Sequence, residues 1–254
     1  MKKYSKIFKV VENTRLNPSF FLLGLELGES LPKIKPGQFV EILIENANEV
    51  FLRRPFSIHD VIEEENRLDI LVQIIGKGTE ALSNIKEDEE LSLLFPLGNG
   101  FPIRNQKALL VGGGCGVAPL LHLSREIHAL GQRPNLLIGA RSKEQLFELD
   151  RFAEFSDLFI STEDGSEGIK GMVVDIPAIE EDYDIIYTCG PTPMMEAVAK
   201  IANQRNIPCY VSLENTMACG IGACLCCVVE TKDGHKCTCT EGPVFLAEDL
   251  SSMS

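Results

Sequence analysis

Apolar positions in the first hundred residues come in short runs separated by turn-forming residues. Such runs occupy residues 20–27, 38–44, 68–75 and 91–95, with Pro, Gly and Asn between them. Apolar runs of four to eight residues bounded by these residue types are typical of β-strands. We therefore expect a six-stranded antiparallel barrel between Lys6 and Phe101. A glycine turn at residues 76–79 predicts one short helix over residues 80–85.

The pattern changes after Lys107, where apolar strands alternate with helical stretches. Strands are predicted at residues 108–112, 135–140 and 185–188, and helices at residues 118–130 and 193–203. Alternation of this kind favours a parallel sheet covered by helices. A central α/β domain is therefore expected to follow the barrel.

After Val211 the chain becomes rich in cysteine and glycine and has too little periodic apolar sequence for a core of its own. Six of the nine cysteines lie between Cys219 and Cys239. A bound metal centre is a common way to hold such a segment. The resulting domain prediction is a barrel over residues 1–102, an α/β domain over 103–210 and a metal-binding region over 211–254.

Composition narrows the possible partners and the compartment. The net charge of −13 repels nucleic acid and anionic lipid, and no Lys/Arg cluster offsets it. The longest charge-free stretch, residues 108–124, contains four glycines and a proline and does not resemble a membrane span. Charged residues interrupt the first fourteen positions, so a secretory signal is not expected. We expect a cytoplasmic protein with reduced cysteines, whose partners are small molecules and other proteins.

The most specific motif is the cysteine cluster. Cys219, Cys224 and Cys227 have the C-x4-C-x2-C spacing of plant-type 2Fe-2S proteins, which take one further cysteine from elsewhere in the chain. The small residues between the first two cysteines allow backbone N–H groups to approach the sulfurs. Spacing selects Cys227 over its neighbour Cys226, whereas Cys237 and Cys239 are equally suited as the fourth ligand.

Zinc is the alternative interpretation of the same segment. A zinc knuckle would use Cys224, Cys227, Cys237 and Cys239. The C-x2-C half suits zinc, but the C-x-C half is unusual for it. The spacing therefore favours iron–sulfur.

Two motifs in the barrel region suit a dinucleotide. Arg54 can pair bidentately with a pyrophosphate, and the aromatic ring and hydroxyl of Phe56 and Ser57, which follow Pro55, can contact the rest of the ligand. Gly78-Thr79, at the start of the predicted short helix, offers backbone N–H groups to an anion without adding positive charge. An acidic protein could hold a pyrophosphate in this way.

Two loops of the α/β region are candidates for a second nucleotide. The segment from Gly112 through Gly114 and Gly116 to Pro119 reads as G-x-G-x-x-P between a strand and a helix, and it departs from the Rossmann fingerprint at Val117. Cys189-Gly190-Pro191 also ends a strand and precedes a helix. In a doubly wound sheet both loops face the ligand crevice. Paired carboxylates and a Ser-His-Asp order are not evident, so no catalytic side chain is assigned.

These motifs, in this order, resemble the ferredoxin-reductase superfamily of flavoproteins. Within it, the segment beginning at Glu214 and the final Cys239-Thr-Glu-Gly-Pro-Val-Phe are similar to the family of electron-transfer subunits of type B dihydroorotate dehydrogenases. The resemblance covers essentially the whole chain. It implies a flavin-binding barrel that holds FAD, an NAD-binding α/β domain and a C-terminal 2Fe-2S loop.

The resemblance also implies roles for individual residues. The fourth cluster ligand would be Cys239, FAD would be held by residues 54–57 with its pyrophosphate at Gly78 and Thr79, and Leu71, Val72 and Gln73 would lie along the cofactor. The acidic residue of the Rossmann pattern is missing and Arg141 follows the second strand, an arrangement that suits NADP, whereas the resemblance favours NAD.

The expected function follows from the resemblance. Electrons would pass between NAD+ and the FMN of a separate dihydroorotate dehydrogenase catalytic subunit, through FAD and the 2Fe-2S cluster, in pyrimidine biosynthesis. The two subunits would form a heterotetramer of two plus two. The alternatives are an NAD(P)H-dependent flavin and iron–sulfur reductase that serves ferredoxin, sulfite or polysulfide, and a zinc-stabilised nucleotide-binding module.

Overall fold

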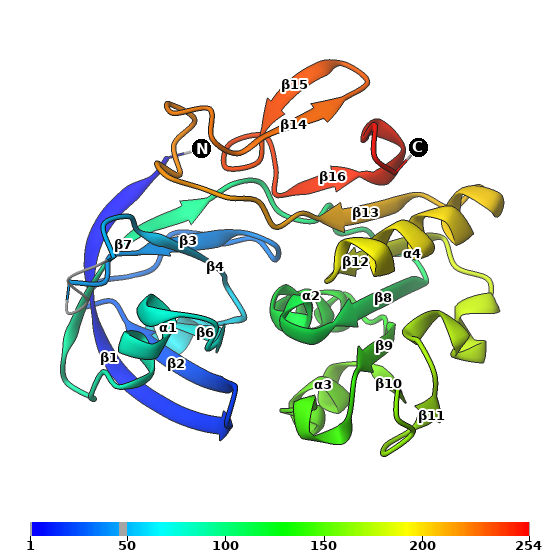
Figure 1. Ribbon diagram of the computed structural model, residues 1–254, viewed down its shortest axis with the longest axis horizontal. Coiled ribbons are helices and arrows are strands. Elements are labelled where there is room, and N and C mark those ends of the chain that lie inside the picture. The colour runs from blue at the N-terminus through cyan, green and yellow to red at the C-terminus, as the bar shows by residue number, and fades with distance from the viewer. Residues whose placement is uncertain (1, 46–49, 254) are drawn as a thin grey trace.

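The computed structural model describes residues 2–45 and 50–253, and within them the chain forms two sheet-based halves with a C-terminal segment lying over both (Figure 1). The first half is an antiparallel sheet whose strand order is β4-β3-β7-β1-β2-β6-β5. Its strands are β1 (Tyr4–Asn17), β2 (Phe20–Glu26), β3 (Phe39–Ile42), β4 (Arg54–Ser57), β5 (Asp60–Ile62), β6 (Arg67–Gln73) and β7 (Glu90–Leu97). Helix α1 (Lys77–Ser83) follows β6.

The antiparallel arrangement agrees with the sequence prediction, but the sheet curls into a half-barrel whose strand order ends at β4 and β5, and it is called the barrel below. It has seven strands in the described part of the chain, one more than predicted. The additional pairing involves β5, which has three residues and joins β6 through the turn at Glu63–Glu65. A strand this short shows too little alternation to be recognised by its pattern. The apolar side chains of the curled sheet form one core that includes Phe8, Leu23 and Phe95.

The second half is a mainly parallel sheet with the order β11-β10-β9-β8-β12-β13-β16. Its strands are β8 (Ala108–Gly113), β9 (Asn135–Ala140), β10 (Asp157–Thr162), β11 (Ile169–Lys170), β12 (Ile185–Cys189), β13 (Cys209–Ser212) and β16 (Val244–Leu246). The helices are α2 (Ala118–Ala129), α3 (Leu149–Phe155) and α4 (Thr192–Gln204). The predicted α/β domain is confirmed.

Both faces of the parallel sheet are buried, as expected for this architecture. Along β8, Leu110 packs in the core formed with α2 and α3, whereas its neighbours Leu109 and Val111 pack in the core formed with α4. The strands therefore appear in the sequence as continuous apolar runs. This is why the periodicity located them well.

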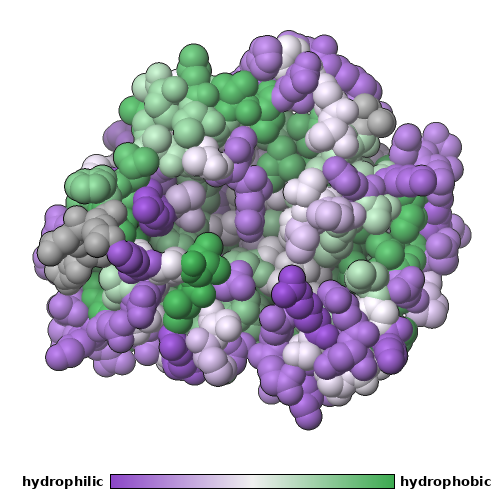
Figure 2. All heavy atoms as spheres, in the orientation of Figure 1, coloured by the Kyte–Doolittle hydropathy of each residue, from purple (hydrophilic) through white to green (hydrophobic). Residues whose placement is uncertain are grey.

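The C-terminal segment does not form a separate core. It leaves β13, passes over the barrel, and forms the hairpin β14 (Val228–Thr231) and β15 (Gly234–Cys237) before β16 pairs antiparallel with β13 (Figure 1). Figure 2 shows an exposed apolar area over this segment, where Ile221 and Leu225 are 49% and 64% exposed. In the described residues, no helix combines the length and the apolar character needed to cross a bilayer.

Candidate functional site

Two adjoining cavities lie where the barrel meets the α/β domain. The barrel-side cavity, of about 820 Å³, is lined by β4, by the end of β6 and by residues 212–217. The strand-end crevice, of about 760 Å³, lies at the carboxyl ends of β8, β9 and β12. Open α/β sheets bind ligands at such strand ends, and each cavity is large enough for a sizeable ligand.

Most of the residues predicted to hold a flavin line the barrel-side cavity. They are Arg54, Pro55, Phe56, Ser57, Leu71, Gln73 and Thr79. Strand alternation along β6 directs Val72 the other way, into the barrel core, and Gly78 is buried against Ile44 and Val50. The other seven residues predicted to hold the flavin therefore lie together on the wall of one cavity.

Adjacent arginines at the start of β4 have different tasks. Arg53 donates hydrogen bonds to the Ser92 carbonyl and hydroxyl oxygens, at 2.6 and 2.9 Å, and so links the start of β4 to β7. The Arg54 Nη1 atom donates to the Leu52 carbonyl oxygen at 2.8 Å, and Arg54 lines the cavity. A guanidinium whose remaining donors face a cavity suits a pyrophosphate, which accepts hydrogen bonds bidentately.

The strand-end crevice brings together the two predicted loops. Gly114, Gly116, Gly190 and Pro191 line it, whereas Gly112, Pro119 and Cys189 lie behind this lining. Gly112 is packed so tightly against Leu120 and Val117 that an added Cβ would lie 2.8 Å from each side chain. These residues shape the loops rather than face the cavity.

Four residues form a wall common to both cavities, namely Gln73, Cys115, Leu213 and Glu214. Burial raises the pKa of the Cys115 thiol to about 12, and the nearby Glu214 carboxylate adds to the shift. Burial likewise raises the pKa of Glu214 above its usual range. The motifs did not single out Cys115 or Glu214, because only the tertiary fold places both at the point where two bound ligands would meet.

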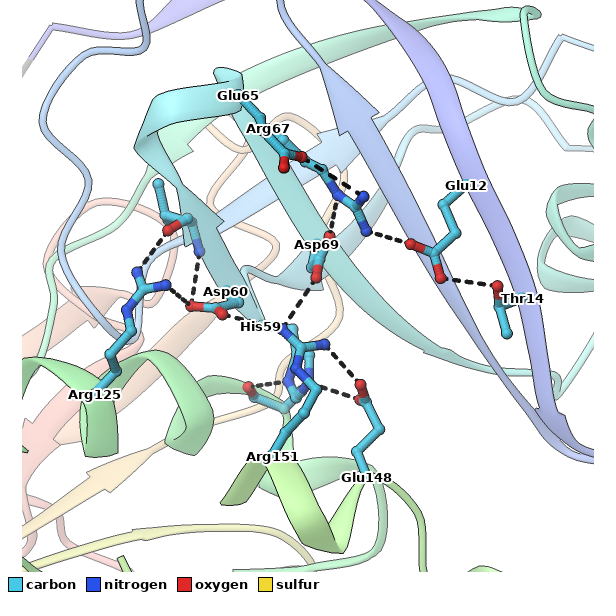
Figure 3. A network of polar contacts seen from close by, with 12 residues as sticks. Glu12, Thr14, His59, Asp60, Glu65, Arg67, Asp69, Arg125, Glu148 and Arg151 are labelled. Atoms are coloured by element: carbon cyan, nitrogen blue, oxygen red, sulfur yellow. Dashed lines mark hydrogen bonds and ion pairs between the residues drawn. The ribbon is translucent and has the colours of Figure 1, made fainter. Parts of the chain in front are cut away.

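The domain junction beside these cavities is held by a network of polar contacts (Figure 3). The ring nitrogens of the fully buried His59 lie 2.7 Å from the Ala118 carbonyl oxygen and 2.9 Å from the Glu148 carboxylate. Arg151 of α3 reaches the carboxylates of Asp60 and Asp69 in the barrel, at 3.0 and 3.2 Å. Ala118 lines the barrel-side cavity, so this network helps to fix the two cavities relative to each other.

The cysteine loop is shaped to surround sulfur-bound iron. Cys219 Sγ accepts hydrogen bonds from the backbone N–H groups of Ala223 and Cys224, at 3.3 and 3.4 Å. Backbone hydrogen bonds, the largest from Ile221, lower the pKa of the Cys219 thiol to about 6, which favours the thiolate that binds metal. Gly220 and Gly222 have φ values of +63° and +84°, which only glycine adopts without strain.

The other candidate ligands lie around the same loop. Cys227 and Cys239 are buried, and Cys239 N donates to Cys227 Sγ at 3.4 Å, whereas Cys224 and Cys226 are exposed. The donor set of thiols with converging backbone N–H groups fits a 2Fe-2S cluster. Among the described residues, no three His, Cys, Asp or Glu side chains are grouped as a ready-made single-ion site, so the ligand set stays a prediction.

Phe39 and Met217 separate the cysteine loop from the barrel-side cavity. Both line that cavity, and both also pack in a small core with Cys227, Cys237 and Cys239. A single layer of side chains therefore stands between the cysteines and the cavity. The arrangement suits two redox groups held close to each other.

Comparison with known proteins gives matches along the whole chain. Residues 214–251 match the iron-sulfur cluster binding domain of dihydroorotate dehydrogenase B, which favours iron over zinc for the cysteine loop. The electron transfer subunit of dihydroorotate dehydrogenase B (NAD(+)) from Clostridium acetobutylicum is 40% identical over 253 residues, 98% of each chain. The corresponding subunit of Caldanaerobacter subterraneus subsp. tengcongensis is 38% identical and covers 95% of this chain and 96% of its own.

Solved structures give a consistent comparison. A chain of the NADH-dependent reduced ferredoxin-NADP oxidoreductase superposes with a TM-score of 0.87 at 31% identity, covering 97% of this chain and 90% of that one. Phthalate dioxygenase reductase, which transfers electrons from pyridine nucleotides to a 2Fe-2S centre, has a TM-score of 0.65 at 23% identity, covering 78% and 64%. The latter likeness concerns the fold, which is that of the ferredoxin reductases.

Proposed function

Because the chain belongs to the family of electron-transfer subunits of NAD+-linked dihydroorotate dehydrogenase B, we propose that it passes electrons between NAD+ and the FMN of a dihydroorotate-oxidising catalytic subunit. The layer formed by Phe39 and Met217, between the cysteine loop and the barrel-side cavity, carries this proposal. It brings a cysteine loop suited to a 2Fe-2S cluster within one side-chain layer of a cavity suited to FAD.

The chain's own residues would hold each group in place. Arg54, Pro55, Phe56, Ser57, Leu71, Gln73 and Thr79, which line the barrel-side cavity, would contact FAD, whereas Val72 and Gly78 would only shape the backbone beneath it. The cluster would be bound by Cys219, Cys224, Cys227 and Cys239. The NAD ligand would be held by Gly114 and Gly116 of the glycine turn and by Gly190 and Pro191 of the loop after β12, with Gly112, Pro119 and Cys189 supporting these loops from behind. When bound, FAD converts a two-electron hydride transfer into single electrons, which a 2Fe-2S cluster carries one at a time.

The common wall of the two cavities would position the nicotinamide against the flavin. Gln73 contributes an amide to both cavities, and the Cys115 thiol, whose pKa is raised to about 12, stays protonated at neutral pH. Neither group is required to move a proton in hydride transfer. The protein would act by placing the reacting atoms and excluding water.

The catalytic partner would dock over the cysteine loop. Ile221 and Leu225 of this loop have about half or more of their surface exposed. Exposed apolar patches often mark sites of protein–protein interaction. A complex of two plus two subunits, located in the cytoplasm, completes the proposal.

Reconstitution with the FMN subunit tests the function. The purified pair should reduce NAD+ with dihydroorotate, and the electron-transfer chain alone should show flavin absorbance and the electron paramagnetic resonance (EPR) signal of a reduced 2Fe-2S centre. Cys219→Ser should lose iron and that signal, whereas the control Cys226→Ser should keep both. Iron-free wild-type protein, or a cluster that survives Cys219→Ser unchanged, would refute the proposed centre.

A second candidate is a reductase that exchanges electrons with ferredoxin. The 31% identity and TM-score of 0.87 to a chain of a ferredoxin-NADP oxidoreductase favour it. Activity with NADH and ferredoxin that exceeds activity with the FMN subunit and dihydroorotate would support this alternative.

A further inference from the structure

Glu41 is a charged residue in a strand that is otherwise apolar and fully buried. Along β3, Val40 and Ile42 point into the barrel core, and Phe39 packs on the opposite side against the cysteine core. Alternation places Glu41 on the same side as Phe39. Its side chain is therefore outside the barrel but beneath the cysteine loop, and the residue is only 1% exposed.

The carboxylate has no hydrogen-bond donor to compensate for this burial. Neither Oε1 nor Oε2 has a hydrogen-bond partner among the described residues. Two positive charges, Arg53 and Lys3, lie near enough to favour the ionised form, whereas burial opposes it and raises the pKa of Glu41. An unpaired buried carboxylate is costly, so its presence in a native fold calls for an explanation.

The carboxylate lies directly against the cysteine loop. A Cβ atom added to Gly220 would be 2.7 Å from Glu41 Cδ and Oε2, so the carboxylate packs on the backbone that immediately follows Cys219. On the same glycine, Lys3 Nζ lies 3.5 Å from the carbonyl oxygen. One peptide of the loop is thus flanked by a negative and a positive side chain.

We propose that Glu41 and Lys3 are opposing charges that tune the reduction potential of the cluster held by this loop. The inference rests on the proposed function, because it presupposes a 2Fe-2S centre at Cys219. Reduction adds one negative charge to the centre, which a nearby carboxylate disfavours and a nearby ammonium group favours. In a site shielded from water these effects are larger than on an open surface, and net charge near a cluster is a known determinant of its potential.

The test is a redox titration of the cluster, followed by EPR in the holoprotein. At a fixed pH, Glu41→Gln should shift the cluster midpoint to a more positive potential. Lys3→Met should shift it to a more negative one. The matched control Glu26→Gln, on an exposed position of β2 separated from β3 by β7 and β1, should leave it unchanged.

Iron content, measured first, separates the failure modes. Wild-type protein without iron would refute the proposed function itself. A loaded cluster whose midpoint is unchanged in Glu41→Gln and Lys3→Met would overturn only the tuning role. Shifts of the same sign in both variants would also overturn it, since they would indicate a loosened loop. If Glu41→Gln cannot hold iron, the Lys3→Met titration decides, and an unchanged midpoint there refutes the proposal.

Discussion

Gly116 lies so close to Cys189 that a Cβ atom at position 116 would be 2.4 Å from the Cys189 carbonyl oxygen. It would be equally close to the Cα atom of Gly190. The neighbours are backbone atoms, which cannot rotate away. This contact joins the glycine turn after β8 to the loop after β12, and it explains why both loops line one crevice.

Replacing Gly116 with alanine should therefore force the two loops apart. We expect Gly116→Ala to cost about 1–3 kcal/mol of stability by overpacking and to weaken NADH binding more than tenfold. Reduction of the bound flavin by NADH, followed by its absorbance, measures the second effect. Gly28→Ala, whose Cβ would meet no atom within 4 Å, is the control. Wild-type NADH affinity in Gly116→Ala would show that the crevice does not hold the nucleotide.

The sequence predicted the fold best where strands are buried on both faces. The run at residues 135–140 coincides with β9, because Leu136, Leu137 and Ile138 pack into cores on opposite sides of the sheet. The 14-residue β1 is less evident, since charged residues such as Lys6 and Lys9 lie on both of its faces and interrupt the apolar alternation. Helix α3, with seven residues, is too short to show a clear period.

The candidate site was predictable where a motif encodes a local shape. The cysteine spacing and the glycine turns are of this kind, and the structure gathers them at one junction. Glu41 and Glu214 were not predictable as site residues, because the burial of Glu41 and the position of Glu214 between the two cavities both depend on segments distant in sequence. The single acidic residue in the apolar run at 38–44 was the available signal for Glu41. The hydrophobic pattern marks such a residue as unusual but does not predict which segment covers it in the fold.

Arg151 should contribute to stability by holding the two domains together. Arg151→Met would leave the buried Asp60 and Asp69 with fewer partners, although Arg125 still pairs with Asp60 and Arg67 with Asp69. Removing one partner of a buried ion pair costs about 3–5 kcal/mol. Because the Arg151 side chain is 34% exposed, we expect a smaller loss, about 2 kcal/mol.

Urea unfolding of the holoprotein measures this loss. The exposed pair of Lys6 and Glu29 supplies the control, because Lys6→Met should change stability by less than about 1 kcal/mol. Equal losses in the two variants would show that the junction network adds nothing beyond a surface ion pair.

His122 should make the protein sensitive to acid. Burial, together with the charges of Arg125 and His59, lowers its pKa in the folded state from 6.5 to about 3. The unfolded chain therefore binds one more proton than the folded chain between these values, so stability falls as the pH drops below about 6.5. The expected slope is at most about 1.4 kcal/mol per pH unit.

Replacing the imidazole should remove this slope. In His122→Leu, the loss of unfolding free energy between pH 7 and pH 5 should be smaller than in the wild type, as measured by urea unfolding at each pH. His235→Gln changes an exposed histidine of the β14–β15 hairpin and should leave the slope intact. A wild-type slope in His122→Leu would assign the acid sensitivity to other groups.

Glu163 should help the crevice to select NAD over NADP. It lines the strand-end crevice together with Arg141, and its backbone N–H donates to the Ala140 carbonyl oxygen at 3.0 Å. Arg141 alone would accept a 2'-phosphate, but the carboxylate beside it repels that group. Glu163→Gln should raise kcat/KM for NADPH by about threefold to tenfold, or about 0.7–1.4 kcal/mol, with little change for NADH. Flavin reduction by each nucleotide measures the ratio of kcat/KM for NADPH to that for NADH. Glu180→Gln, outside the crevice, is the control. An unchanged ratio in Glu163→Gln would show that the adenosine ribose binds elsewhere.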